Sequence, residues 1–112
     1  MHHLLPALVL IAQLLTRGRV GIATTFASTN DPGNPNPLCY CTNKVLRDHD
    51  LVVAHPILPC GSLVLLYAPR TKKSVVARVL DRGPRRAMID LSHGTARALG
   101  ANGYETIVMM PL

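Results

Sequence analysis

Two aspartates end apolar runs in the stretch VLDRGPRRAMIDLS, which covers residues 79–92. The chain has only six acidic residues, so Asp81 and Asp90 make up a third of its carboxylates. A carboxyl group at the end of a buried strand is held rigidly and loses solvation, and the resulting rise in pKa is what a general acid requires. The same positions also suit a turn-capping role for Asp81 and a helix-start role for Asp90. The residues alone leave the catalytic and the structural interpretation open.

The surroundings of these aspartates are basic. Four arginines stand near them: Arg78, Arg82, Arg85 and Arg86. Positive charge favours the ionised form of a carboxyl group, so the arginines act against the effect of burial on its pKa. The sequence does not decide which of the two effects is larger.

His55 and the three cysteines are the other residues able to carry chemistry. His55 closes the apolar run at 52–54, where a histidine serves either the structure or a catalytic carboxylate. Cys39 and Cys41 are too close in sequence for an unstrained bridge, so we expect Cys60 to form a disulfide with one of them. The alternative is a zinc site made of the cysteines with His49 or His55. Because C-x-C lacks the usual spacing of zinc ligands, we expect no metal and no cofactor.

A series of short runs rich in β-branched residues predicts β-strands. They cover residues 21–26, 50–55, 62–68, 74–80, 87–90 and 105–110. Ser92 is a suitable N-cap for one short helix near 92–99, and Gly100 stands where a left-handed residue ends a helix. Residues 28–37 predict a polar surface loop, and RTKK at 70–73 predicts a solvated basic turn. This pattern favours an all-β, compact barrel with one helix.

Composition indicates one exported domain. The apolar run at 4–15 is too short to span a bilayer, which takes roughly 18 or more residues, and it is typical of a signal peptide. We therefore expect a leader at 1–19, a domain at 20–112 and no stable membrane span. The net charge of +6 indicates a polyanionic partner. Three tyrosines, one phenylalanine and no tryptophan argue against nucleic acid, because single strands are bound by stacking on aromatic side chains.

Three ordered blocks resemble the rare lipoprotein A (RlpA-like) family of double-psi β-barrels. The blocks are LVVAHPILPCGSLVLL, SVVARVLDRGP and AMIDLSHGTARALG, and GIATTFAS is similar to the family's opening strand. The resemblance covers about residues 20–112 and implies a six-stranded double-psi β-barrel. Expansins and barwin-like proteins share this barrel.

Members of this family are bacterial lytic transglycosylases, so the resemblance also implies site residues. Asp81 matches the catalytic aspartate of the DRGP motif, and His55 matches the histidine that accompanies it. Four further residues are expected to bind substrate or to support the site: Asp90, Arg82, Arg85 and Thr25. The arginines would meet lactyl or peptide carboxylates on the glycan.

The chain departs from the family pattern in two places. No lipobox cysteine follows the apolar run, so we expect no lipid anchor. The stretch YCTNKVLRDHD at 40–50 replaces the usual T-A-N-G-E loop. The second departure concerns glycan specificity more than the fold.

The expected protein is a monomeric peptidoglycan lytic transglycosylase of the periplasm or cell wall. It would cleave the β-1,4 bond between N-acetylmuramic acid and N-acetylglucosamine and leave a 1,6-anhydro product, with Asp81 as general acid/base. Two alternatives remain. One is a glycan-binding or expansin-like wall-loosening protein without turnover, and the other is a small secreted or phage structural protein.

Overall fold

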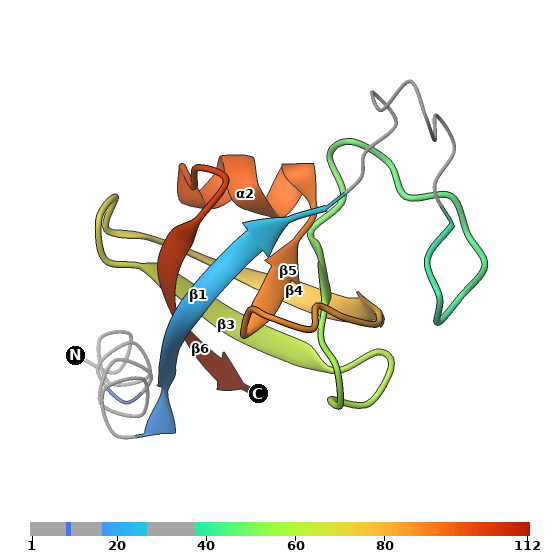
Figure 1. Cartoon of the computed structure of the whole chain (residues 1–112), viewed down its shortest axis with the longest axis horizontal. Helices are drawn as coiled ribbons and strands as arrows, with labels where there is room; N and C mark the ends of the chain where they lie inside the picture. Colours follow the sequence, from blue (N-terminus) through green and yellow to red (C-terminus); the bar gives the residue numbers. More distant parts are fainter. Residues whose placement is uncertain (1–8, 10–16, 27–37) are drawn as a thin grey trace.

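The computed structural model describes residues 9, 17–26 and 38–112, and in them the chain forms a closed β-barrel (Figure 1). Most of the expected leader at 1–19 and the whole expected loop at 28–37 lie outside the described residues. The strands are β1 (Arg19–Thr25), β2 (Val52–Ala54), β3 (Leu63–Ala68), β4 (Lys73–Asp81), β5 (Ile89–Leu91) and β6 (Glu105–Pro111), and the helix is α2 (His93–Leu99). Within the described part of the chain, no helix is long and apolar enough to cross a membrane.

The strands close in the order β1-β5-β2-β4-β3-β6. Two neighbouring pairs, β1 with β5 and β2 with β4, run parallel, and the other pairs whose register is known run antiparallel. Parallel partners cannot be joined by a tight hairpin, so the chain crosses over between them. The expected six-stranded barrel with one short helix is confirmed, and each predicted strand overlaps an observed one.

Alternating side chains fill the barrel. On β3, Val64, Leu66 and Ala68 are fully buried, and the two residues between them are partly exposed. The same core contains Val53, Val79, Ile89, Leu91 and Ile107 from the other strands. Full burial of one such aliphatic side chain favours folding by about 1.5–3 kcal/mol, so this small core depends on each strand.

Helix α2 lies across one end of the barrel (Figure 1), and buried hydroxyl groups fasten it to β2. Ser92 Oγ accepts the backbone N–H groups of Thr95 (3.3 Å) and Val52 (3.2 Å) and donates to the carbonyl of Asp50 (2.8 Å). Thr95 Oγ1 donates to the carbonyl of Val52 at 2.9 Å. The helix ends at Gly100, whose φ of 62° is left-handed. Both predicted helix ends are therefore confirmed.

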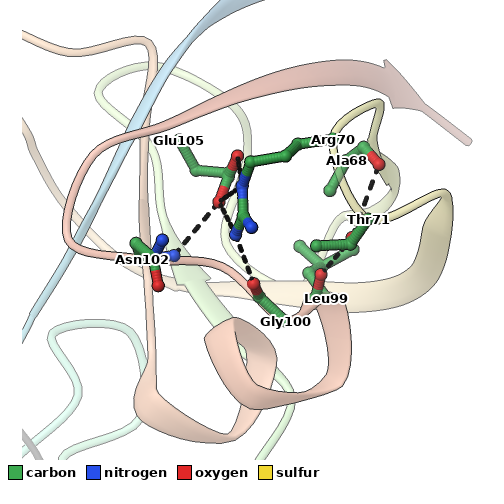
Figure 2. Close-up of polar contacts among 7 residues, drawn as sticks. All are labelled: Ala68, Arg70, Thr71, Leu99, Gly100, Asn102 and Glu105. Carbon is green, nitrogen blue, oxygen red and sulfur yellow. Dashed lines mark hydrogen bonds and ion pairs between the residues drawn. The ribbon is translucent and has the colours of Figure 1, made fainter.

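The opposite end of α2 is held by an arginine–glutamate pair (Figure 2). Arg70 Nη2 donates to Glu105 Oε1 at 2.7 Å and to the carbonyl of Gly100 at 2.7 Å. Glu105 is buried, and the hydrogen bonds from Arg70, followed by that from the Asn102 amide, hold the pKa of its carboxyl below the usual value. The stretch at 70–73 is thus more than a solvated turn, because its first residue joins β6 to the end of α2.

A second apolar cluster lies outside the barrel. Cys39, Leu46 and Val52 are buried there, with Phe26 and Leu80 packed against them. Cys41 forms a disulfide with Cys60, which confirms that Cys60 is paired. Cys39 is a buried free thiol, and its pKa is raised by burial and then by the charges of Asp81 and Asp50. The segment at 38–51 is therefore fastened to the barrel by both apolar packing and a covalent bond.

Gly94 provides a test of the α2–β2 contact. A Cβ atom there would stand 2.5 Å from the carbonyl oxygen of Asp50 and 2.7 Å from the carbonyl carbon of His49, and backbone atoms cannot rotate away. We expect Gly94→Ala to lower the free energy of unfolding by about 1–3 kcal/mol, despite the better helix propensity of alanine. Gly103→Ala is the matched control, because a Cβ there meets nothing within 4 Å. Equal urea midpoints for the two variants would contradict the close contact.

The disulfide provides a second test. Replacing Cys41 and Cys60 together by serine should lower the free energy of unfolding by about 3 kcal/mol, because the bridge joins residues 19 apart and restricts the unfolded chain. Urea unfolding measures the change. As a control, the unreduced parent protein should expose one thiol in denaturant, that of Cys39. Three titrating thiols would show that the bridge does not form.

Candidate functional site

A change of register between β2 and β4 sets the position of Asp81. Val53 lies opposite Val79, but Ala54 lies opposite Asp81, so Leu80 is an extra residue on β4. Such a β-bulge breaks the alternation of side chains along a strand. Val79 points into the core, and regular alternation would point Asp81 the same way. Because of the bulge, Asp81 is partly exposed and Leu80 packs in the outer cluster.

The bulge brings Asp81 into a row with Asp90. Ala54 on β2 is opposite Asp81 on one side and Asp90 on the other, and Thr24 is opposite Asp90 on β1. Residues directly opposite in a sheet share a face, so this row lies outside the barrel. Neighbouring strands are about 4.8 Å apart, which places the two aspartate backbones roughly 10 Å apart. The small side chain of Ala54 stands between the two carboxylates.

Of the two carboxylates in the row, Asp81 is the one that accepts hydrogen bonds from backbone N–H groups. Its Oδ1 accepts the N–H of Arg82 at 2.9 Å and that of Tyr40 at 3.4 Å. Its own carbonyl accepts the N–H of His55 at 3.1 Å. The loop-capping contact with Arg82 is therefore present, and it leaves Oδ2 free of hydrogen bonds to the described residues. The capping role and a chemical role use different oxygens of the same group.

Asp90 stands in a less polar place. Its Oδ1 accepts the hydroxyl of Thr24 at 2.8 Å. Burial raises the pKa of Asp90, the Thr24 hydrogen bond lowers it by a smaller amount, and the negative charge of Asp81 raises it further. Asp90 is thus the carboxyl group of the row that burial and a neighbouring charge predispose to keep a proton.

His55 is neutral and has a defined tautomer. Its Nδ1 accepts the backbone N–H groups of Ile57 (3.2 Å) and Leu58 (3.0 Å), so the ring proton must be on Nε2. Burial lowers the pKa of His55, and the positive charges of Arg82 and Arg19 lower it further. The histidine holds the loop that follows β2 and offers a hydrogen-bond donor at Nε2.

The two arginines expected to bind substrate differ in their contacts. Arg82 donates from Nη1 to the carbonyls of His55 (3.1 Å) and Leu58 (2.6 Å) and from Nη2 to Cys60 Sγ (3.4 Å). These bonds give Arg82 a supporting role in the loop at 55–60. Arg85 is exposed, and its side chain has no hydrogen bond or ion pair to the described residues. Its expected contact with a substrate carboxylate stays a prediction.

Thr25 lies beside the row rather than in it. It ends β1 and lines a hollow of about 290 Å³ with residues of α2 and of the loop at 101–103. The hydroxyl that contacts Asp90 belongs to its neighbour, Thr24. Sequence reasoning missed Thr24, although the pair of threonines at the end of a predicted strand was a signal for it.

Among the described residues, no group of three or more His, Cys, Asp or Glu side chains could hold a metal ion. The chemistry that this face supports is proton transfer between carboxyl groups and a bound molecule.

The raised pKa of Asp90 predicts how stability depends on pH. Ionisation of this group is less favourable in the folded chain than in the unfolded chain, so its contribution to stability is lost as pH rises above about 3.9, the usual aspartate value. Asn at this position can still accept the Thr24 hydroxyl without a charge. We expect Asp90→Asn to be more stable than the parent protein at neutral pH, with a difference that shrinks below about pH 4.

Chemical unfolding at both pH values measures this difference. Asp50→Asn is the matched control, because Asp50 lies before β2. Among the described residues its carboxylate accepts the exposed amide of Arg47 (2.8 Å) and lies 3.9 Å from Nε2 of the exposed His49. A pH-independent difference, or a loss of stability at neutral pH, would contradict a buried and charge-coupled Asp90.

Several bacterial proteins that are named as peptidoglycan transglycosylases are similar to this chain in sequence. No family model matches the chain. Over 64 residues it is 47% identical to a probable endolytic peptidoglycan transglycosylase RlpA of Nostoc sp., a match that covers 55% of this chain and 17% of that protein. The endolytic peptidoglycan transglycosylase RlpA of Pasteurella multocida is 34% identical over 64 residues, which cover 55% of this chain and 22% of that protein. The chain spans about a fifth of the length of these relatives.

Two solved structures share the fold. An expansin of Clavibacter michiganensis matches with a TM-score of 0.64 at 22% identity, over 85% of this chain and 50% of the expansin chain. A Streptomyces papain inhibitor matches with a TM-score of 0.56 at 18% identity, over 83% of this chain and 94% of the inhibitor. The expected double-psi β-barrel is confirmed. The resemblance to the rare lipoprotein A family is confirmed too, by relatives named RlpA in several bacteria that match about half of the chain.

Proposed function

We propose that the protein is a peptidoglycan lytic transglycosylase that cleaves the bond between N-acetylmuramic acid and N-acetylglucosamine. The observation that carries the proposal is the outer row Thr24–Asp90–Ala54–Asp81, in which two carboxylates on different strands share one face. The names of the curated relatives supply the substrate class. The match covers only part of those relatives, so the reaction itself is our proposal for this chain.

In the proposed mechanism, Asp81 is the general acid and then the general base. It donates a proton to the oxygen that leaves from C1 of the muramyl sugar, and the C1–O4 bond breaks. The carboxylate then takes the proton of the muramyl 6-hydroxyl, whose oxygen bonds to C1 and closes the 1,6-anhydro ring. One proton leaves Asp81 and one returns, so the reaction needs neither water nor a second reactant.

His55 and Asp90 assist Asp81 in this scheme. The Nδ1 atom of His55 is occupied by two backbone amides, so the ring acts through its Nε2–H, as a donor to a substrate oxygen and not as a base. Asp90 stays protonated more readily than an ordinary aspartate, which limits repulsion beside the charged form of Asp81. Arg82 holds the loop that carries His55, and Arg85 is available for acidic groups of the glycan.

The disulfide supports export, because such bridges persist in oxidising compartments. We therefore propose that the protein works in the periplasm or at the cell wall. Glycan binding without cleavage is the second candidate function. It is favoured by the capping contact of Asp81 with Arg82, which is sufficient to explain an aspartate at this position.

Asp81→Asn tests the mechanism. Asn is nearly isosteric and its side-chain oxygen can still accept the Arg82 amide, but it cannot carry a proton. We expect the release of anhydro-muropeptides from purified sacculi to fall by roughly 10²–10⁴-fold, while the urea midpoint changes little. Mass spectrometry of the soluble products measures the rate and identifies the anhydro ends.

Asp50→Asn, with the same change of charge away from the row, should release products at the parental rate. Parental release by Asp81→Asn would remove Asp81 from the mechanism. A larger loss in Asp90→Asn than in Asp81→Asn would assign the proton transfer to Asp90. A parent protein that binds sacculi but releases nothing would favour the binding function.

A further inference from the structure

Tyr40 is exposed to solvent, and its backbone lies beside Asp81. Tyr40 is 70% exposed, although the chain has only four aromatic residues, three tyrosines and one phenylalanine. Its backbone N–H points to Asp81 Oδ1 at 3.4 Å. The Tyr40 hydroxyl makes no hydrogen bond to any residue that the structure describes. The ring therefore contributes little to the fold in the described part of the chain.

The neighbours of Tyr40 fix its backbone on both sides. Cys39 is buried in the outer cluster, and its N–H bonds to the carbonyl of Lys44 at 3.0 Å. Cys41 is bonded to Cys60, and its N–H donates to the carbonyl of Leu80 at 2.9 Å. A residue between two such anchors has little freedom to move away from the carboxylate. The point from which the exposed ring projects is thus fixed in advance, next to Asp81.

A second segment, the loop at 56–60, also begins beside Asp81, and we call it and the segment around Tyr40 the two walls of the site. The loop at 56–60 is held by the Nδ1 atom of His55 and by Arg82, and it carries Ile57, which is 80% exposed. The carbonyl of Asp81 accepts the N–H of His55, so this loop begins next to the backbone of Asp81. The Cys41–Cys60 bridge ties the two walls together. Two exposed residues with large apolar surface, Tyr40 and Ile57, therefore lie on segments that meet at Asp81.

We propose that Tyr40 is a binding residue that packs against the ring of an N-acetylhexosamine in the glycan next to Asp81. A pyranose ring presents C–H groups on its faces and hydroxyl groups at its edges. A tyrosine side chain, apolar over its ring and polar at its tip, matches this pattern. The proposal rests on the proposed function, because it takes the glycan as the ligand and Asp81 as the reacting group.

The test measures binding without turnover. The Asp81→Asn protein is titrated calorimetrically with a purified tetrasaccharide of alternating N-acetylglucosamine and N-acetylmuramic acid. The double variant Asp81→Asn, Tyr40→Ala is titrated in the same way, and the two affinities are compared. We expect the affinity to fall about tenfold, as when one ring face loses its apolar packing surface. Tyr40→Phe should bind within about twofold of the parental affinity, because it keeps the ring and removes only the hydroxyl.

Tyr104→Ala is the matched control. Tyr104 is 80% exposed and lies in the loop between α2 and β6, which Figure 1 shows far from the segment at 38–47. Its replacement should leave the affinity within about twofold. Equal affinities for Tyr40→Ala and its background protein would overturn the proposal while leaving the glycan function intact. A background protein that does not bind the tetrasaccharide would overturn both. Thermal melting of each variant confirms that the fold is kept.

Discussion

The one-residue register shift between β2 and β4 is the constraint on which the candidate site depends. A regular β4 would direct Leu80 outward and Asp81 into the core, where an unpaired carboxylate is very unfavourable. With the bulge, the side chains of both Leu80 and Asp81 face outward. The bulge occurs opposite Ala54, whose partner on the other side is Asp90. A backbone irregularity of a single residue thus converts two distant aspartates of the sequence into two members of one row. Bulges next to active sites commonly re-aim a side chain in this way.

The row also explains why two aspartates in similar sequence contexts have different electrostatic surroundings. Asp81 is at the end of its strand, where the chain turns and backbone N–H groups become available to it. Asp90 is in the middle of β5, between Ile89 and Leu91, and the amides on either side of it belong to the sheet. Its donor is a side chain, Thr24, and its pKa rises because burial outweighs that single bond. Position along a strand, more than residue type, separates the two groups.

Local features of the sequence predicted the elements well. Ser92 and Gly100 marked both ends of α2, because capping depends on residues within one turn. The pairing of Cys60 was expected, but the choice of Cys41 over Cys39 depended on the outer cluster, which assembles residues from four separate segments. The same limit applies to the site. Tyr40 and the bulge at Leu80 are placed by strand pairing and long-range packing, for which the sequence carries no local signal. The contact of Thr24 with Asp90 depends on the same strand pairing.

The stretch at 40–50 is where this chain departs from the pattern of the family it resembles, and the structure gives that departure a physical role. Leu46 in the middle of this segment and Cys39 just before it pack with Leu80, the extra residue of the bulge. An outward-facing leucine is favourable only if something removes it from water. Cys41 then binds the backbone carbonyl of Leu80 and reaches across to Cys60 in the loop that His55 and Arg82 hold. The segment therefore stabilises the bulge that aims Asp81 and supplies one of the two walls beside it, so changes of sequence in this segment act on the site through the geometry of β4.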